Sequence, residues 1–598
     1  MERGSSIARW LFLGVAVFLF MQYGWPMLSG GTGPSERQPL GARDDLGPSG
    51  ERPAEQRCTI ESERFRAVLS SRGASVVSAA MLDRKYATAV DKTDTPIELV
   101  TTSVESRAPL RSDLRAPGVP DAAQLVPSND LDWQLVASEA GSCTFRYTDA
   151  TVELTKVVER SPRPFELSVK LSAKNLADSA RSYRVAVEQT VWRTKAETEG
   201  SLGRQSELLT EVVLHTASET KRLHPDAFDP GDFGGEGFTP EAWLRVPGAG
   251  VFAAVSSTYF SSMVAHKGGP AVPAVEAQIE ERWSESRFPK KTDDPNFGHV
   301  YRARLAYPTA ELAPGDTVSY EQLAFFGPKE REVLAGFGGA GDDSLGASAL
   351  IDLGMFGAIG KILIGYVYWL FRHVGSWGWA ICLLTITVKI AVFPLSFSQL
   401  KSTVAMRRIK PQMDELNARY KDDAAQRGLA LQELWRKEGV GNPVIGCIPM
   451  LLQMPVWFSL YSALQTAVEL YHVPFGPLIP DLSAPDQYHV IPFVLGASSF
   501  IQQRIMPMQG DPMQQKMMLY MMPIIFTVMM FFLPAGLGVY MLTNSWLGIG
   551  QQLLVERWIS SKLKPAASIE VREVNKDSDK PEDANAAPIG KGKARARG

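Results

Sequence analysis

Cysteine is scarce in this chain, and no familiar catalytic or nucleotide-binding motif occurs in it. Only four of its 598 residues are cysteines, with no CxxC pair and no Cys/His ligand spacing: Cys58, Cys143, Cys382 and Cys447. HExxH, GxSxG and GxxxxGK[ST] are also missing. A zinc module, a serine hydrolase and a P-loop enzyme are therefore not supported. The formal net charge of −3 argues against a general nucleic-acid binder.

Charged residues are nearly missing from long apolar runs in the second half of the chain. Five such runs follow residue 350: 377–397, 443–467, 490–503, 517–533 and 537–555. Roughly 20 apolar residues cross a hydrocarbon core about 30 Å thick. A further run, residues 10–28, predicts a retained anchor, because no A-x-A-like cleavage site follows it. We therefore predict six transmembrane helices, which excludes a wholly soluble enzyme.

The distribution of basic residues predicts the orientation in the membrane. Residues 399–439 hold nine Lys and Arg side chains, whereas the connections 468–488 and 534–536 hold none. Because cytoplasmic loops retain basic residues, both termini are predicted to be cytoplasmic and residues 29–350 periplasmic. Residues 355–374 do not read as a further span, since Lys361 interrupts them. We predict an amphipathic helix on the outer membrane surface there.

The predicted external region begins with a linker and continues with segments in which apolar and polar residues alternate. Residues 29–56 are rich in Gly, Pro and charge, which is typical of a disordered linker. Apolar and polar residues then alternate over 165–171, 183–187 and 301–305, which predicts a large all-β sandwich. Cys58 and Cys143 could form a disulfide if this domain is extracytoplasmic, although we favour two unrelated buried thiols. Sugar binding would rest on fold analogy alone.

Two basic segments are predicted on the cytoplasmic side. Residues 399–441 form a helical hairpin with a charged turn at 421–428, and its charge favours docking of acidic partners or lipid headgroups. Residues 559–598 form a tail that ends in KGKARARG. Such a tail suits weak contact with ribosomal RNA or with anionic lipid.

One charge, Lys389, lies inside the predicted spans. An ammonium in the hydrocarbon layer is costly, so Lys389 should face polar groups or water; the alternative is snorkelling to the headgroups. Polar side chains of the spans could line a wet groove around it: Thr385, Gln453, Ser462, Gln465, Ser498, Gln502, Thr543 and Asn544. The spans hold no Asp or Glu, which disfavours a cation-coupled transporter.

Methionine is concentrated near the fifth span. Ten of the twenty methionines fall between residues 506 and 541. Flexible thioether side chains adapt to varied apolar partners, although any single methionine could simply fill a gap in a bundle. We predict a hydrophobic slide for substrate helices that includes Met454, Met521 and Met530.

Four segments carry a resemblance to a known family. They are VKIAVFPLSFSQLKSTVAMRRIKPQM, NPVIGCIPMLLQMPVWFSLYSAL, DPMQQKMMLYMMPIIFTVMMFFLPAGLGVY and QQLL. In this order they resemble the YidC/Oxa membrane protein insertases of the Gram-negative type, with a large periplasmic domain. The resemblance covers residues 355–560 closely and the preceding domain mainly in architecture.

The resemblance implies a five-helix core around a hydrophilic groove that inserts and helps fold nascent inner-membrane proteins, alone or with the Sec translocon. Family members usually carry Arg where this chain has Lys389, which keeps the charge without the bidentate fork. Tyr540 carries over as a substrate contact. No catalytic residue, cofactor or metal is implied. A small-solute transporter and a carbohydrate-binding envelope sensor are the alternatives.

The predicted organisation has six parts. They are an anchor (1–28), a linker (29–56), a β-sandwich (57–340), a linker with an interfacial helix (341–376), the insertase core (377–558) and a basic tail (559–598).

Overall fold

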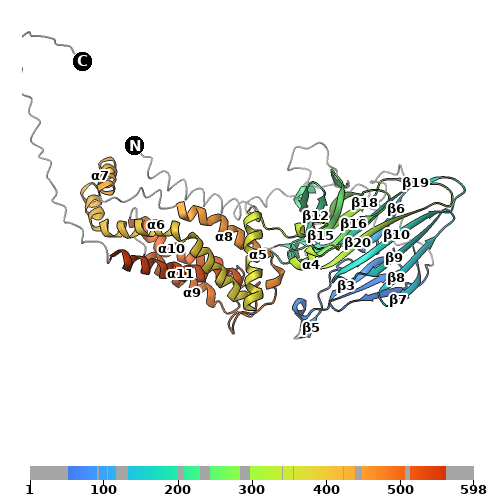
Figure 1. The fold of residues 1–598 in the computed structure, drawn as a ribbon, viewed down its shortest axis with the longest axis horizontal. Helices are drawn as coiled ribbons and strands as arrows, with labels where there is room; N and C mark the ends of the chain where they lie inside the picture. Colours follow the sequence, from blue (N-terminus) through green and yellow to red (C-terminus); the bar gives the residue numbers. More distant parts are fainter. Residues whose placement is uncertain are drawn as a thin grey trace, which may run out of the picture.

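The computed structural model describes most of the chain between residues 52 and 560. The described ranges are 52–90, 93–103, 105–115, 132–199, 206–228, 243–282, 297–339, 341, 343–354, 356–421, 423–437, 448–505 and 512–560. The predicted anchor, nearly all of the linker and the basic tail lie outside them. Figure 1 shows a strand-rich region and a helical region, with helix α5 where they meet.

Two large antiparallel sheets form the strand-rich region. The nine-stranded sheet has the order β13 (Thr220–Leu223), β12 (Glu211–Thr216), β15 (Gly250–Ser256), β16 (Phe260–Gly268), β20 (Thr317–Pro328), β10 (Glu166–Asn175), β9 (Val152–Arg160), β8 (Ser142–Thr148), β7 (Gln134–Glu139). The second sheet has the order β14 (Leu244–Val246), β17 (Ala274–Arg282), β18 (Gly298–Ala306), β11 (Arg181–Thr194), β19 (Ala310–Leu312), and β6 (Arg111–Arg115) pairs with β11. A three-stranded sheet has the order β1 (Arg57–Glu61), β2 (Phe65–Ser70), β3 (Ser75–Met81). A two-stranded sheet pairs β4 (Thr88–Val90) with β5 (Thr93–Thr95).

Alternating side chains make this region a sandwich. On β10, Leu167, Val169 and Leu171 are buried, whereas Lys170 on the opposite face is exposed. Strands of the two large sheets pack on each other, and their inward apolar side chains form one continuous core. The predicted β-sandwich is therefore confirmed, and it follows from the period-two pattern.

A disulfide joins Cys58 on β1 to Cys143 on β8. Our preference for two unrelated thiols is therefore wrong. The two cysteines lie 85 residues apart in the chain, and only the pairing of the small sheet against the large one brings them together. No local pattern in the sequence carries that information.

The helical region holds seven longer helices among the described residues. They are α5 (Gly357–Val374), α6 (Trp377–Arg419), α7 (Ala424–Lys437), α8 (Ile448–Thr466), α9 (Val490–Ile505), α10 (Pro512–Met530) and α11 (Ala535–Ser560). Shorter elements are α3 (Lys195–Thr198), α4 (Arg331–Ala335), η2 (Arg84–Tyr86), η3 (Glu105–Arg107), η5 (Pro225–Phe228), η6 (Ala347–Leu350) and η8 (Val468–Leu470). Helix α5 buries one face through Ile364, Val367 and Leu370 and exposes Ile362, as an amphipathic helix does.

The predicted hairpin differs from the observed helices in two respects. Helix α6 continues unbroken from the predicted span 377–397 through residues 399–419, so the first helix of the hairpin is an extension of the span helix. Pro394 and Pro411 lie inside it. Helix α7 begins at Ala424, within the segment expected to be the turn. A change from apolar to charged composition marks a change of environment, and it does not by itself end a helix.

One described helix is long and apolar enough to cross a membrane by length and composition, over Trp377–Pro394. A shorter apolar stretch covers Met518–Met530. The predicted start of another span, residues 443–447, lies outside the described ranges.

The loop after α8 joins the helices to the sandwich. The ring of Tyr471 lies 5.1 Å from that of Tyr259 and 6.2 Å from that of Tyr86, centroid to centroid. Lys85 Nζ donates a hydrogen bond of 3.1 Å to the carbonyl oxygen of Glu469. Tyr471 is thereby part of the sandwich core, although it is more than 130 residues from the last strand.

Candidate functional site

Lys389 lies where three helices meet. Helix α11 packs on both α6 and α9. A methyl group added at Gly548 of α11 would lie 3.8 Å from Lys389 Nζ on α6 and 3.3 Å from Gln502 Nε2 on α9. The half-buried ammonium therefore ends beside a side-chain amide and a glycine that leaves room for both. This is a polar setting inside an otherwise apolar bundle.

Hydrogen bonds between α9 and α11 extend this polar setting. Ser545 Oγ donates to Gln502 Oε1 at 3.2 Å, and Trp546 Nε1 donates to Ser498 Oγ at 3.0 Å. The first of these bonds orients the Gln502 amide, because its oxygen accepts the Ser545 hydroxyl. Among the described residues, Lys389 has no carboxylate within ion-pair distance. Its charge is thus left available to an incoming anion.

Several other predicted groove residues are buried or occupied. Thr385 is 1% exposed, and its hydroxyl donates to the Ile381 carbonyl oxygen at 2.7 Å. Asn544 is half-buried on α11. Gln465 is 6% exposed, and its Nε2 has no hydrogen-bond partner among the described residues. The side chain of Gln453 lies outside the described part of the chain.

Tyr540 lies inside the helical core. It is 2% exposed and belongs to the apolar cluster formed by α5, α6, α8, α9 and α11. A substrate could touch this ring only if neighbouring helices moved apart. The structure therefore does not bring Tyr540 together with Lys389 on an accessible surface.

The three methionines of the predicted slide are divided between surface and core. Met454 on α8 and Met521 on α10 are 37% and 52% exposed. Met530 is 1% exposed, and its Cε lies 3.0 Å from a methyl group added at Gly538. The exposed surface of α10 consists instead of large apolar side chains: Met518, Tyr520, Met521, Ile524, Ile525 and Val528.

Gly548, Ser545 and Trp546 were not predicted as site residues. A signal for them exists in the sequence, because Ser545 and Gly548 are spaced three apart and continue the polar pair Thr543 and Asn544 along α11. Small residues in an apolar helix allow close approach of a neighbouring helix or side chain. Neither feature identifies Lys389 as the group that approaches, since that depends on how the helices pack.

Family models divide the chain near residue 367. The model described as YidC periplasmic domain matches residues 57–366, and the model described as 60Kd inner membrane protein matches residues 369–562. The chain belongs to the YidC family. Named relatives are called membrane protein insertase YidC. The protein of Anaeromyxobacter dehalogenans strain 2CP-1 is 31% identical over 86% of this chain and 87% of its own length. That of Citrifermentans bemidjiense is 30% identical over 84% and 86%.

This YidC-family chain is a membrane protein insertase of the inner membrane, as the resemblance implied. A solved structure of an active YidC insertase with its first transmembrane domain resolved covers 84% of this chain and 93% of its own, at 16% identity and a TM-score of 0.35. A galactose mutarotase related enzyme from Lactobacillus acidophilus covers 45% of this chain and 97% of its own, at 13% identity and a TM-score of 0.31. At these scores neither likeness bears on activity.

Proposed function

We propose that Lys389 forms the electrostatic centre of a client-binding groove between α6, α9 and α11. The observation that carries the proposal is the meeting of Lys389 Nζ, the Gln502 amide and Gly548. A cation in a medium of lower permittivity than water attracts a passing carboxylate more strongly than a surface lysine does. The acidic outer segment of a nascent membrane protein would therefore pause here while its apolar segment enters lipid.

The energy for insertion comes from the client. Transfer of its apolar surface from water to hydrocarbon releases roughly 25 cal/mol for each Å². The exposed apolar side chains of α10, together with Met454 on α8, support a lateral exit along these two helices. The chain itself need not form or break a covalent bond, so we propose a non-enzymatic insertase without a cofactor.

The wider arrangement belongs to the same proposal. Six spans, five of them in the insertase core, leave both termini in the cytoplasm and the β-sandwich in the periplasm. The basic residues of α6 and α7 support the cytoplasmic position of the hairpin. Clients arrive as nascent membrane proteins, and the Sec translocon and the ribosome are proposed as further partners.

Substitution of Lys389 tests the groove. In reconstituted vesicles, Lys389→Arg should insert normally, whereas Lys389→Ala and Lys389→Glu should impair reporters with acidic outer segments. For Lys389→Ala the loss should be about tenfold, as expected for one charge-assisted contact, and Lys389→Glu should lose more. Insertion of paired reporters that differ only in acidic or neutral outer segments is the measurement.

Arg504→Ala is the matched control, because Arg504 is an exposed basic residue near the end of α9, outside the hairpin and not among the proposed groove residues. It should insert both reporters normally. Equal insertion of acidic and neutral reporters by every Lys389 variant would leave Lys389 as a snorkelling lysine without a role in client binding.

The hairpin formed by the end of α6 and α7 is expected to be essential. Met406 and Ile409 of α6 pack with Leu434 of α7, so the pair forms its own small apolar core. Replacement of residues 401–439 by a short Gly/Ser linker should leave a membrane-integrated protein that no longer inserts clients. Full insertion in vesicles by this variant would contradict a docking or gating role.

A further inference from the structure

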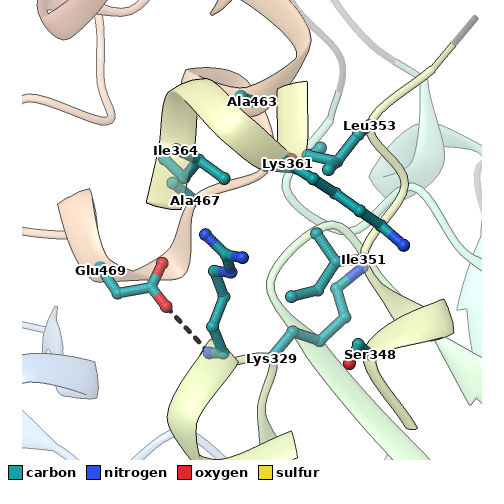
Figure 2. Close-up of a pocket in the computed structure, with 11 residues that line it drawn as sticks. Lys329, Ser348, Ile351, Leu353, Lys361, Ile364, Ala463, Ala467 and Glu469 are labelled. Atoms are coloured by element: carbon teal, nitrogen blue, oxygen red, sulfur yellow. Dashed lines mark hydrogen bonds between the residues drawn. The ribbon is translucent and has the colours of Figure 1, made fainter. Parts of the chain in front are cut away.

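A pocket lies where the sandwich meets the helical region. The end of β20, α4, the segment after η6, α5, α8 and η8 all contribute to it (Figure 2). Its empty space is about 430 Å³, part of which is open to solvent. Ile351, Leu353 and Ile364 form apolar walls, and four charged residues also line the pocket.

The charged lining is predominantly basic. Lys329, Arg331 and Lys361 carry positive charge, and Glu469 is the carboxylate among the described lining residues. Glu469 Oε1 accepts a hydrogen bond of 3.0 Å from the Arg331 backbone N–H, drawn as a dashed line in Figure 2. One oxygen of the carboxylate is therefore engaged by the backbone, and the three side-chain cations are not neutralised by it.

Lys329 is a buried ammonium with little compensation. Its side chain is 3% exposed, and Nζ donates one hydrogen bond of 3.3 Å to the Leu350 carbonyl oxygen. Among the described residues no carboxylate lies within ion-pair distance of it. A lysine ammonium has three donors, and a buried charge is costly unless it is paired. Burial accordingly lowers the pKa of Lys329 to about 8.

The other two cations are also available. Among the described residues, the Arg331 guanidinium has no ion-pair partner; its Cζ lies 5.4 Å from the centroid of the Tyr368 ring. Lys361 is exposed on α5, and Figure 2 shows its end on the same side of the pocket as that of Lys329. Two lysine ammonium groups thus lie on one side of the pocket, and Arg331 adds a guanidinium to its lining; all three are donors of the kind that bind phosphate oxygens.

The surroundings favour a lipid as the source of that phosphate. Ile362, next to Lys361, is 73% exposed, and Trp369 on the same helix is 48% exposed. Large apolar side chains beside a basic cluster are typical of a helix at the membrane interface. A headgroup in the pocket would have its acyl chains beside this exposed face.

We propose that this pocket binds the phosphate group of an anionic phospholipid headgroup. The bound phosphate neutralises Lys329 and joins Arg331 of the sandwich side to Lys361 of α5. The lipid thereby ties the external region to the helix that leads into the core. The proposal rests on the interfacial position of α5 and is independent of client binding at Lys389.

Lipid retention by the full-length protein tests the pocket. Delipidated protein in neutral detergent is titrated with phosphatidylglycerol, phosphatidylcholine or inorganic phosphate and followed by native mass spectrometry. The unaltered chain should retain phosphatidylglycerol preferentially. Lys361→Gln and Arg331→Gln should each weaken this binding about tenfold, because each removes one charge-assisted contact. Lys361 is exposed, so its substitution should not disturb folding.

Arg372→Gln is the matched control, since Arg372 lies on α5 outside the pocket lining. It should bind phosphatidylglycerol as the unaltered chain does. Equal retention of the two lipids, or an equal loss in Arg372→Gln, would overturn the proposal. Saturation by inorganic phosphate without a preference for phosphatidylglycerol would overturn the lipid as the source. Insertion assays are not the readout, so these outcomes leave the role of Lys389 unaffected.

Discussion

The buried arginine–glutamate network of the sandwich differs from the lone cation Lys389 of the helical core. Inside the sandwich, Arg304 and Glu276 are 1% and 2% exposed and form an ion pair of 2.6 Å, and Glu276 also pairs with Arg184 and Arg245. In the helical core, Lys389 forms no ion pair with a carboxylate among the described residues, and its ammonium lies near Gly548. A closed network serves the fold, whereas an unmatched charge remains free to act on something that arrives from outside.

The largest expected effect follows from opening the closed network. Glu276→Ala leaves three arginines without their common partner, and removal of one partner from a buried ion pair costs about 3–5 kcal/mol. The free energy of unfolding of the sandwich should fall by that amount, measured by urea-dependent proteolysis of the full chain. Client insertion should change little while the protein stays folded.

An exposed ion pair of the same sandwich provides the control for Glu276. Lys170 and Glu321 lie 4.0 Å apart and are 55% and 47% exposed. Glu321→Ala should cost less than about 1 kcal/mol, because solvent screens the pair. Equal losses for the two substitutions would contradict the contrast between closed and open charges.

A smaller effect is expected at the junction between the two regions. Burial raises the pKa of Glu469 to about 6, with Lys85 lowering it and Glu330 raising it. The folded state therefore favours the protonated acid. The stabilisation is present below pH 4.5, is lost as the pH rises to about 6, and amounts to about 2 kcal/mol. Docking of the sandwich on the loop after α8 should thus be tighter at pH 4.5 than at pH 7.

Glu469→Gln should remove this pH dependence and keep the docked state at neutral pH. Pulsed electron paramagnetic resonance between spin labels on the sandwich and on α11 measures the distribution of distances at each pH. Glu332→Gln, on the exposed face of α4, is the control. A distribution that narrows as the pH rises would contradict the sign of the effect.

The smallest effect on insertion is expected from deleting the sandwich. The proposed groove and slide lie after residue 350. A chain that lacks residues 60–320 but retains α5 should rescue growth after depletion of the native protein. Failure to rescue, despite normal membrane levels, would show that the external region acts in insertion.

Sequence patterns predicted the elements more reliably than their contacts. Alternation over β10 identified a strand because side-chain direction is a local property, and apolar runs located α9 and α11 for a similar reason. The helix of the predicted span 377–397 continues into the hairpin, since no residue near 398 stops α6. Lys389 stood out through its charge alone. Its neighbours Gln502 and Gly548 depend on the packing of three helices, which no single segment encodes.

The Cys58–Cys143 bridge has a consequence for membrane orientation. Structural disulfides form and persist in oxidising compartments and are rare in the cytosol. The bridged and reduced forms differ in compactness, because the bond closes 85 residues of chain. Thiol alkylation followed by non-reducing electrophoresis would therefore report whether a given molecule has exported its sandwich. The redox state of this disulfide in each molecule therefore indicates on which side of the membrane its sandwich lies.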